Sequence, residues 1–241
     1  MKELTLNDTH IWYDPALLSE SPEACFSADY WQQQGKISGS AKGRGTTWFI
    51  RGKELEMALR HYRRGGLFGK LVSDSYLFTG WESTRSYQEY VLLKWLAEQG
   101  VNVPRPVAAR AVKAGLAYKA DILVEKVPMA KDLVHLLEEE SLPEEMYRQI
   151  GVMIAQMHQA GVNHTDLNIH NILVDADQKV WIIDFDKCAR QSGDSWHQDN
   201  LSRLKRSFYK EQERRSIHWQ EGEWSALLQG YEEAKLACVT D

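Results

Sequence analysis

The 241-residue sequence predicts an α+β protein with two lobes, an N-terminal antiparallel sheet with one helix and a mainly helical C-terminal lobe. Short β-prone runs separated by glycine-rich turns fill the first half, and longer segments with apolar residues at helical spacing fill the second. Pro128 interrupts the chain between these halves. We therefore place one lobe at residues 1–127 and the other at residues 128–241.

Two segments of the first half predict strands that form a hairpin with a flexible tip. The segment 38–52, SGSAKGRGTTWFIRG, has a glycine- and serine-rich turn before β-prone residues, and the segment 55–66, LEMALRHYRRGG, is a second short strand. A helix is predicted from Ser86 to Gln99, and Gly100 ends it.

Glu89 stands on the apolar face of this helix. Leu92, Leu93 and Leu96 form an apolar stripe, which Glu89 extends backwards at helical spacing. A carboxylate on a buried face needs a partner to offset its lost hydration. We therefore expect a paired Glu89 rather than a surface acid.

The second half begins after the apolar strand ADILVEKV at residues 120–127. Pro143 opens a helix whose first turn is acidic, and Gly161 stops it. Two short strands, NILVD at 171–175 and KVWIID at 179–184, then flank a turn. Two further helices are predicted at about 196–215 and 223–238.

Three polar residues around this pair of strands carry the chemistry. Asp166 and Asn171 are five residues apart in a turn, and Asp184 follows the second strand. Asp166 suits the base that accepts a proton from an attacking hydroxyl, while Asn171 and Asp184 supply the hard oxygen ligands that Mg²⁺ prefers. Asp and Asn in turns usually bond the local backbone. The ordered set with two apolar strands between its members favours the catalytic interpretation.

This order resembles the catalytic core of protein kinases, in which HxDxxxxN is followed by a hairpin and DFG. The matches are His164, Asp166 and Asn171, then Asp184 in the sequence DFD. For His164 we favour a scaffold role over chemistry, and the same holds for His158 and His170.

The kinase pattern also requires a phosphate-contacting lysine on a strand, paired with a glutamate on a helix. Arg60 falls where that lysine would stand, and Glu89 is the candidate partner. An Arg–carboxylate pair is geometrically stronger than a Lys pair but is not equivalent to it. Arg63, Arg64 and Lys70 are alternative phosphate contacts.

The remaining candidates for the nucleotide site are backbone positions. Gly39, Gly43 and Gly45 could bring backbone N–H groups close to phosphates, although their spacing is not GxGxxG and a glycine-rich hairpin tip is common. We also assign Glu125 and Val127, at the end of the strand before Pro128, to nucleotide binding.

Charge and composition indicate the charge of the ligands and the cellular compartment. The net charge is −5, yet residues 42–70 hold eight Lys or Arg against two Glu, a balance of +6, and residues 203–215 hold six against two, or +4. Such local fields attract anionic ligands. The N-terminus has no signal-peptide core, no run approaches the ~18 apolar residues of a membrane span, and the three cysteines form no CxxC pair, so we expect a reducing cytoplasm.

The chain most closely resembles the 3-deoxy-D-manno-octulosonic acid (Kdo) kinases, relatives of the heptose kinases, over nearly its whole length. The resemblance lies in FIRG, LRHYRRGGLFGKL, VPRPVAAR, AYKADIL, HTDLNIHNILVD and WIIDFDKC. It implies a protein-kinase-like fold, with ATP and Mg²⁺ as cofactors and transfer to the 4-hydroxyl of a Kdo residue on a Kdo-lipid A precursor. It also implies a peripheral enzyme at the cytoplasmic face of the bacterial inner membrane, without a transmembrane segment or a nucleic-acid partner.

Departures from the protein-kinase pattern favour a small-molecule or glycolipid acceptor. Thr165 replaces the arginine that pairs with a phosphorylated activation loop, Asn168 replaces the lysine that steadies the γ-phosphate, and Asp186 replaces the DFG glycine. Lys42, Arg44 or an arginine on the substrate side could compensate for the lost lysine. The competing interpretations are a heptose or aminoglycoside kinase and, in another class, a pseudokinase that acts as a lipid-binding module.

The predicted helix at 196–215 carries a basic face. Arg203, Arg206, Lys210 and Arg214 share one side, and apolar residues including Leu204 occupy the other. Such a helix could lie on an anionic membrane or guide a phosphorylated lipid. We favour a solvated face above a packed one, because the core needs the apolar side.

Overall fold

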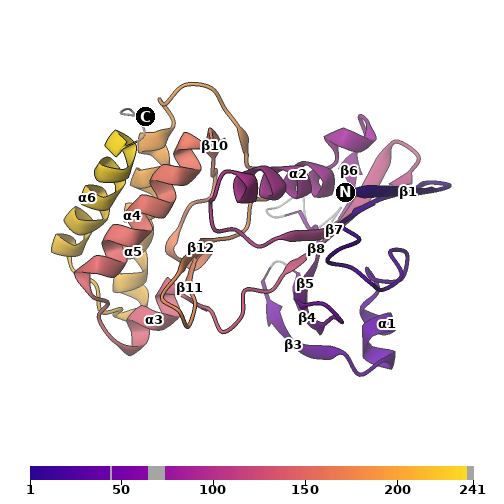
Figure 1. Ribbon diagram of the computed structural model, residues 1–241, viewed down its shortest axis with the longest axis horizontal. Coiled ribbons are helices and arrows are strands. Elements are labelled where there is room, and N and C mark those ends of the chain that lie inside the picture. The colour runs from indigo at the N-terminus through magenta and orange to yellow at the C-terminus, as the bar shows by residue number, and fades with distance from the viewer. Residues whose placement is uncertain (44, 65–73, 238–241) are drawn as a thin grey trace. The chain divides into compact units, whose positions relative to one another are not determined.

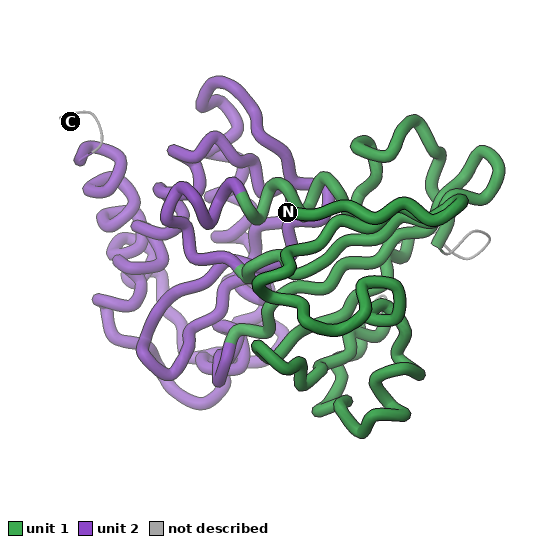
Figure 2. Tube along the Cα trace, turned by 45° about the vertical axis from the view of Figure 1, so that its right-hand side comes forward, with its two compact units in different colours: residues 1–94, 104–127 green, residues 95–103, 128–241 purple. Residues whose placement is uncertain are grey.

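The computed structural model describes residues 1–43, 45–64 and 74–237 (Figure 1). The chain forms two compact units, Met1–Lys94 with Pro104–Val127 and Trp95–Val103 with Pro128–Asp241 (Figure 2). The first holds an antiparallel sheet and the second is mainly helical, so the predicted α+β, protein-kinase-like class is confirmed. The division at residue 127 into a nucleotide-binding and a catalytic lobe stays a prediction.

The first unit is built on one antiparallel sheet in which distant parts of the chain pair. Its order is β1 (Lys2–Leu6), β2 (Thr9–Tyr13), β7 (Pro106–Ala114), β8 (Ala117–Glu125), β5 (Glu56–His61), β4 (Thr46–Arg51) and β3 (Ile37–Lys42), with β6 (Tyr76–Leu77) paired to β8. The two strands of the predicted hairpin are β4 and β5, which pair, and the segment predicted as a glycine-rich turn instead contributes β3, which pairs with β4. Strands β1, β2 and β7 were not predicted from the sequence.

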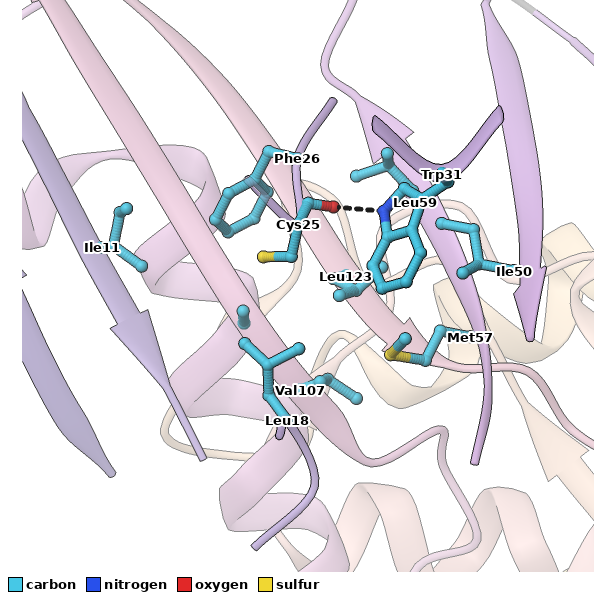
Figure 3. Close-up of a cluster of buried hydrophobic side chains, with 11 residues drawn as sticks. Ile11, Leu18, Cys25, Phe26, Trp31, Ile50, Met57, Leu59, Val107 and Leu123 are labelled. Atoms are coloured by element: carbon cyan, nitrogen blue, oxygen red, sulfur yellow. Dashed lines mark hydrogen bonds between the residues drawn. The ribbon is translucent and has the colours of Figure 1, made fainter. Parts of the chain in front are cut away.

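One face of this sheet is covered by the segment between β2 and β3, which includes the short helix α1 (Ala28–Gln33). Ile11, Leu59, Val107 and Leu123 meet this segment in a buried cluster around Trp31 (Figure 3). The indole Nε1 of Trp31 donates to the carbonyl oxygen of Cys25 at 2.8 Å, which satisfies the polar atom of a side chain with no exposed surface.

Helix α2 (Arg85–Glu98) packs on the other face. Side chains alternate along a strand, so Trp12, next to Ile11, points to α2 and meets the Tyr87 ring at 4.8 Å between centroids. The Ser86 hydroxyl donates to the Arg110 carbonyl at 2.9 Å. The helix ends close to its predicted position, and Gly100 follows with a φ of +78°.

Four helices dominate the second unit: α3 (Leu133–Glu139), α4 (Glu144–Gln159), α5 (His197–Arg215) and α6 (Glu221–Ala237). Helices α4 and α6 approach so closely that a Cβ on Gly151 would lie 2.0 Å from the Leu227 carbonyl oxygen. A Cβ on Gly230 would lie 2.2 Å from the Arg148 carbonyl oxygen. Glycine therefore permits backbone contact between the two helices. Helix α3 was not predicted.

Short strands frame the loop that carries the predicted catalytic residues. Strands β11 (Ile172–Val174) and β12 (Val180–Ile182) form the predicted hairpin, and β9 (Lys131–Asp132) extends it. Strand β10 (Val162–Asn163) pairs with β13 (Ala189–Arg190).

The helices and the cysteines bear on the predicted environment of the chain. Among the helices of the described residues, none combines the length and apolar character needed to cross a bilayer. Cys25 and Cys188 are both buried, and Cys238 lies outside the described residues.

Candidate active site

The proposed base, Asp166, is fixed through its backbone rather than through its carboxylate. Its carbonyl oxygen accepts hydrogen bonds from the side-chain amides of Asn168 at 2.8 Å and Asn171 at 3.0 Å. The residue is half-buried, and its neighbour Thr165 is exposed. The loop is thus anchored by neutral groups, and the carboxylate of Asp166 is not needed to hold these bonds.

Asn168, at the position of the kinase lysine, has a structural role. Its side-chain oxygen accepts from the His170 N–H at 2.9 Å and caps the short 3₁₀ helix η3 (Ile169–Asn171), while its amide nitrogen holds Asp166. Of the two residues predicted to compensate for the missing lysine, Lys42 is exposed in β3 and Arg44 lies outside the described residues.

The two predicted metal ligands are brought together by the β11–β12 hairpin. The Ile183 N–H donates to the Asn171 carbonyl at 3.0 Å, so Asp184 follows directly on a residue bonded to Asn171. Asp184 has a φ of +63°, a left-handed conformation that is uncommon outside glycine and concentrates at functional sites.

The chemistry of these two side chains fits a magnesium ion. The Asn171 amide nitrogen is engaged by Asp166, which orients the amide oxygen as the atom that could face a cation. With the Asp184 carboxylate it offers two hard oxygen donors, and nucleotide phosphates would complete the shell. In the described part of the chain no group of three or more His, Cys, Asp or Glu could hold a metal, so a protein-only cage is absent there.

His164 is a scaffold residue, as predicted. Its imidazole has no exposed surface, and Nε2 donates to the Ile183 carbonyl at 3.0 Å while the ring lies 4.8 Å from the Phe185 ring. Burial lowers the pKa of His164, so the ring is neutral at pH 7. It ties the loop that carries Asp166 to the strand end that carries Asp184.

Asn200 in α5 is a positioning residue that the sequence did not single out. Its side-chain oxygen accepts from the His164 backbone N–H at 3.1 Å, and its amide nitrogen donates to Asn163 Oδ1 at 2.8 Å. Only 2% of Asn200 is exposed. The available signal was one amide on the apolar side of a helix, near Leu201 and Leu204.

Helix α5 contacts the loop at two further points. The Ser207 hydroxyl oxygen accepts from the Ile169 N–H at 3.1 Å, and Glu211 Oε1 lies 3.4 Å from His170 Nε2. The loop around Asp166 is therefore held along one stripe of this helix, at residues 200, 207 and 211.

In the first unit, the structure forms the predicted pair between Arg60 and Glu89. Arg60 Nη2 lies 2.6 Å from both carboxylate oxygens, and the Tyr62 hydroxyl donates to Glu89 Oε2 at 2.5 Å. Glu89 is 4% exposed, and the Arg60 guanidinium and the Tyr62 hydroxyl compensate its buried charge. Contact of Arg60 with nucleotide phosphates stays a prediction.

The other cations predicted as possible phosphate contacts differ in their surroundings. Arg64 Nε donates to the Ser75 carbonyl at 2.7 Å and is engaged in local structure. Arg63 lies beside the glycine-rich tip, because a Cβ on Gly45 would come within 2.9 Å of its Cδ. Lys70 lies outside the described residues. Arg63 therefore stays as the second candidate.

The other nucleotide candidates lie in strand β3, in the turn that follows it, and at the end of β8. Gly39 lies in β3, and Gly43 donates its N–H to the Gly45 carbonyl at 2.8 Å. Glu125 ends β8 and holds Arg105 in a bidentate pair at 2.9 and 2.8 Å, and Val127 follows as a buried residue. The Glu125 side chain is thus committed to Arg105, and nucleotide contact at these positions stays a prediction.

Comparison with known proteins gives a consistent result. A model of the lipopolysaccharide kinase (Kdo/WaaP) family matches residues 28–231. The chain is 60% identical over 232 residues to the 3-deoxy-D-manno-octulosonic acid kinase of Photobacterium profundum, covering 96% of this chain and 98% of that protein. It is 63% identical to the Vibrio cholerae kinase of the same name over 217 residues, 89% of this chain and 92% of that one. The Haemophilus influenzae kinase of that name is 50% identical over 214 residues, 86% and 89% of the two chains.

The match covers both the unit with the Arg60–Glu89 pair and the unit with Asp166, Asn171 and Asp184. Kinases of this kind use ATP and transfer its phosphoryl group to a hydroxyl acceptor. The chain is therefore a phosphotransferase that belongs to the lipopolysaccharide kinase (Kdo/WaaP) family.

Proposed function

We propose that this enzyme transfers the γ-phosphoryl group of ATP to the 4-hydroxyl of a Kdo residue on a Kdo-lipid A precursor, at the cytoplasmic face of the inner membrane. The observation that carries this proposal is the loop around Asp166, which is locked by amides and joined by the β11–β12 hairpin to Asp184. The names of the similar kinases support the Kdo acceptor.

Asp166 would orient the acceptor hydroxyl and take its proton as the hydroxyl oxygen bonds to the γ-phosphorus. The bond between that phosphorus and the β,γ-bridging oxygen breaks, and ADP leaves with the bond's electrons. Asn171 and Asp184 would hold Mg²⁺, which supplies charge neutralisation on the nucleotide phosphates. Asn168 and Asn200 keep the loop in place throughout.

Features of the second unit support a glycolipid rather than a peptide acceptor. Thr165 is exposed and offers no cation to a phosphorylated loop, and only ten residues, 187–196, connect Asp186 to the start of α5. This connection is too short for the extended activation segment that binds peptides in protein kinases. The structure accordingly favours a sugar kinase within the family.

The experiment measures ATP consumption by the purified enzyme with a Kdo-bearing lipid A precursor, and locates the new phosphate by phosphorus–proton NMR. Phosphate on the Kdo 4-hydroxyl is the expected result. Transfer to a heptose acceptor instead would select a heptose kinase, and nucleotide binding without turnover on either acceptor would select the lipid-binding module.

A matched pair of variants tests the base. Asp166→Ala should abolish transfer while nucleotide affinity stays within about twofold, because the base acts only on the acceptor proton. Asp177→Ala, in the exposed turn after β11, is the control and should keep wild-type activity. Retention of activity within about tenfold by Asp166→Ala would rule out the base role, since such groups contribute at least ~10²-fold.

A further inference from the structure

The helix that holds the catalytic loop also presents cations to solvent. Ser207 and Glu211 of α5 contact the loop, and Arg203 and Lys210 flank this stripe on one side, each within about 60° of Ser207 around the helix axis at 3.6 residues per turn. Arg206 lies on the same side one turn from both. All three cationic side chains are exposed.

These three cations differ from the other basic residues of α5. Lys205 pairs with Glu221 at 2.5 Å, and Arg214 and Arg215 pair with Glu211 at 3.5 and 3.0 Å. Within the described parts of the chain, by contrast, none of Arg203, Arg206 and Lys210 forms an ion pair. The helix thus neutralises Lys205 on its opposite side and the two arginines of its last turn, and leaves Arg203, Arg206 and Lys210 without an acidic partner among the described residues.

The acidic residues on this side stand at its ends. Asp199 is in the first turn of α5, where a carboxylate complements the helix dipole, and Glu213 is in the last two turns. Between them the exposed residues of this side are the three cations. The central part of the face therefore carries a charge of +3, although the chain as a whole carries −5.

We infer that Arg203, Arg206 and Lys210 form the subsite that binds the acidic groups of the acceptor and places its hydroxyl at Asp166. The inference rests on the proposed function, which supplies an acceptor with sugar carboxylates and lipid phosphates. Guanidinium groups bind such planar or tetrahedral anions through paired N–H donors, and an ammonium group adds a point charge. The sequence predicted only that the basic face of this helix is solvated, and the inference assigns to that face the acidic groups of the acceptor.

The position of the cations decides between acceptor and bulk membrane lipid. A surface for general lipid binding needs only exposure, whereas these cations neighbour the stripe that fixes Ile169 and His170, within the loop of Asp166. An anion held here is bound to the helix that also anchors the loop of the base, Asp166. The acceptor's own acidic groups are therefore the occupant we assign.

The test is the triple variant Arg203→Gln, Arg206→Gln, Lys210→Gln in the full-length enzyme. Initial rates are measured against a Kdo-bearing lipid A precursor in mixed micelles and against its deacylated, water-soluble form, which keeps the carboxylate and phosphate groups. The KM for both acceptors should rise about tenfold or more, because three ionic contacts are lost together, while the KM for ATP stays within about twofold.

The control removes three exposed charges elsewhere, through Lys2→Gln, Lys53→Gln and Lys235→Gln, and should leave both acceptor KM values unchanged. Thermal unfolding midpoints equal to wild type show that the triple variant is folded. If its midpoint falls, Lys210→Gln alone is measured, and a rise of about threefold in acceptor KM is expected.

Unchanged acceptor KM values in the triple variant overturn the inference. A higher KM for the micellar acceptor alone, with weaker sedimentation on acceptor-free phosphatidylglycerol vesicles, assigns the face to membrane lipid instead. If the wild type transfers nothing, the proposed function fails, and titration of both enzymes with the water-soluble glycolipid then decides the subsite: weaker binding by the triple variant supports it and equal binding overturns it.

Discussion

Replacing Asn200 with alanine tests whether α5 fixes the geometry of the catalytic loop. The substitution removes the acceptor of the His164 N–H and the donor to Asn163 Oδ1, at 3.1 and 2.8 Å, in a side chain that is 2% exposed. A buried polar group left without a partner costs about 1–3 kcal/mol, and a lost ordinary hydrogen bond about 1 kcal/mol. The free energy of unfolding should fall by about 2–4 kcal/mol, measured by urea denaturation.

The kinetic effect should exceed the effect on nucleotide binding. Asn200 holds the backbone two residues before Asp166, and a displacement of ~1 Å in a reacting group costs ~10²-fold in rate. We expect kcat to fall about 10- to 100-fold and the KM for ATP to change less than about twofold, at a temperature where the variant is fully folded.

Tyr231→Phe is the matched control. It deletes a hydroxyl that lies 2.9 Å from His158 Nδ1, in the same buried network but without contact to the loop. It should lower stability by about 1–3 kcal/mol and leave kcat close to wild type. A kcat within twofold of wild type for Asn200→Ala would refute the positioning role, and equal kcat losses in both variants would indicate general loosening of the unit.

Four other perturbations have defined outcomes. Gly151→Ala should lower the free energy of unfolding by about 1–3 kcal/mol in urea, because its Cβ would lie 2.0 Å from the Leu227 carbonyl and must part α4 from α6; unchanged stability would show that the helices separate freely. Burial lowers the pKa of His158 to about 3, whereas its pKa in the unfolded chain is about 6.5. The neutral His158 ring therefore contributes fully to stability above pH ~6.5, and this contribution is lost as the pH falls towards 3. His158→Gln should flatten this part of the stability–pH curve, and an unchanged slope would assign the pH dependence to other groups. Asp184→Ala should weaken binding of magnesium–nucleotide about tenfold or more by titration, and unaltered affinity would remove it from the metal site. Arg60→Ala should raise the KM for ATP, and an unchanged nucleotide affinity and rate would move the phosphate contact to another cation.

The sequence predicted those parts of the fold that local interactions determine. Helix α4 has a proline before its first residue, an acidic first turn, and Gly161 with a φ of +73° after its end. The β11–β12 hairpin has two apolar strands around one turn. The three proposed site residues lie on one continuous stretch, 166–184, which includes this hairpin. Their order in the sequence was therefore sufficient to predict that they belong to one site.

Contacts between distant segments escaped prediction for a physical reason. Strand β2 pairs with β7, Thr9 opposite Val112, and such pairing leaves no periodic signal in either segment. Helix α1 has six residues, too few for periodicity to distinguish it from a loop. Asn200 and Glu211 contact the loop around Asp166 only because α5 packs against a segment some 30–40 residues earlier in the chain, and their own sequence neighbours do not indicate these contacts.

The bonds that order the catalytic loop are almost all made by neutral groups. The Asp166 carbonyl receives two amides, the His164 N–H is bound by an amide oxygen, and the Ile169 N–H is bound by the Ser207 hydroxyl. Neutral groups keep these bonds across a wide range of pH and ionic strength, and Thr165 leaves no cation through which phosphorylation could order the loop. Charge is concentrated on the exposed side of the same helix, where the proposed acceptor would meet it. The fold thus separates a loop ordered by neutral groups from a charged surface, and we expect regulation of this enzyme to act through access of the acidic acceptor rather than through assembly of the loop.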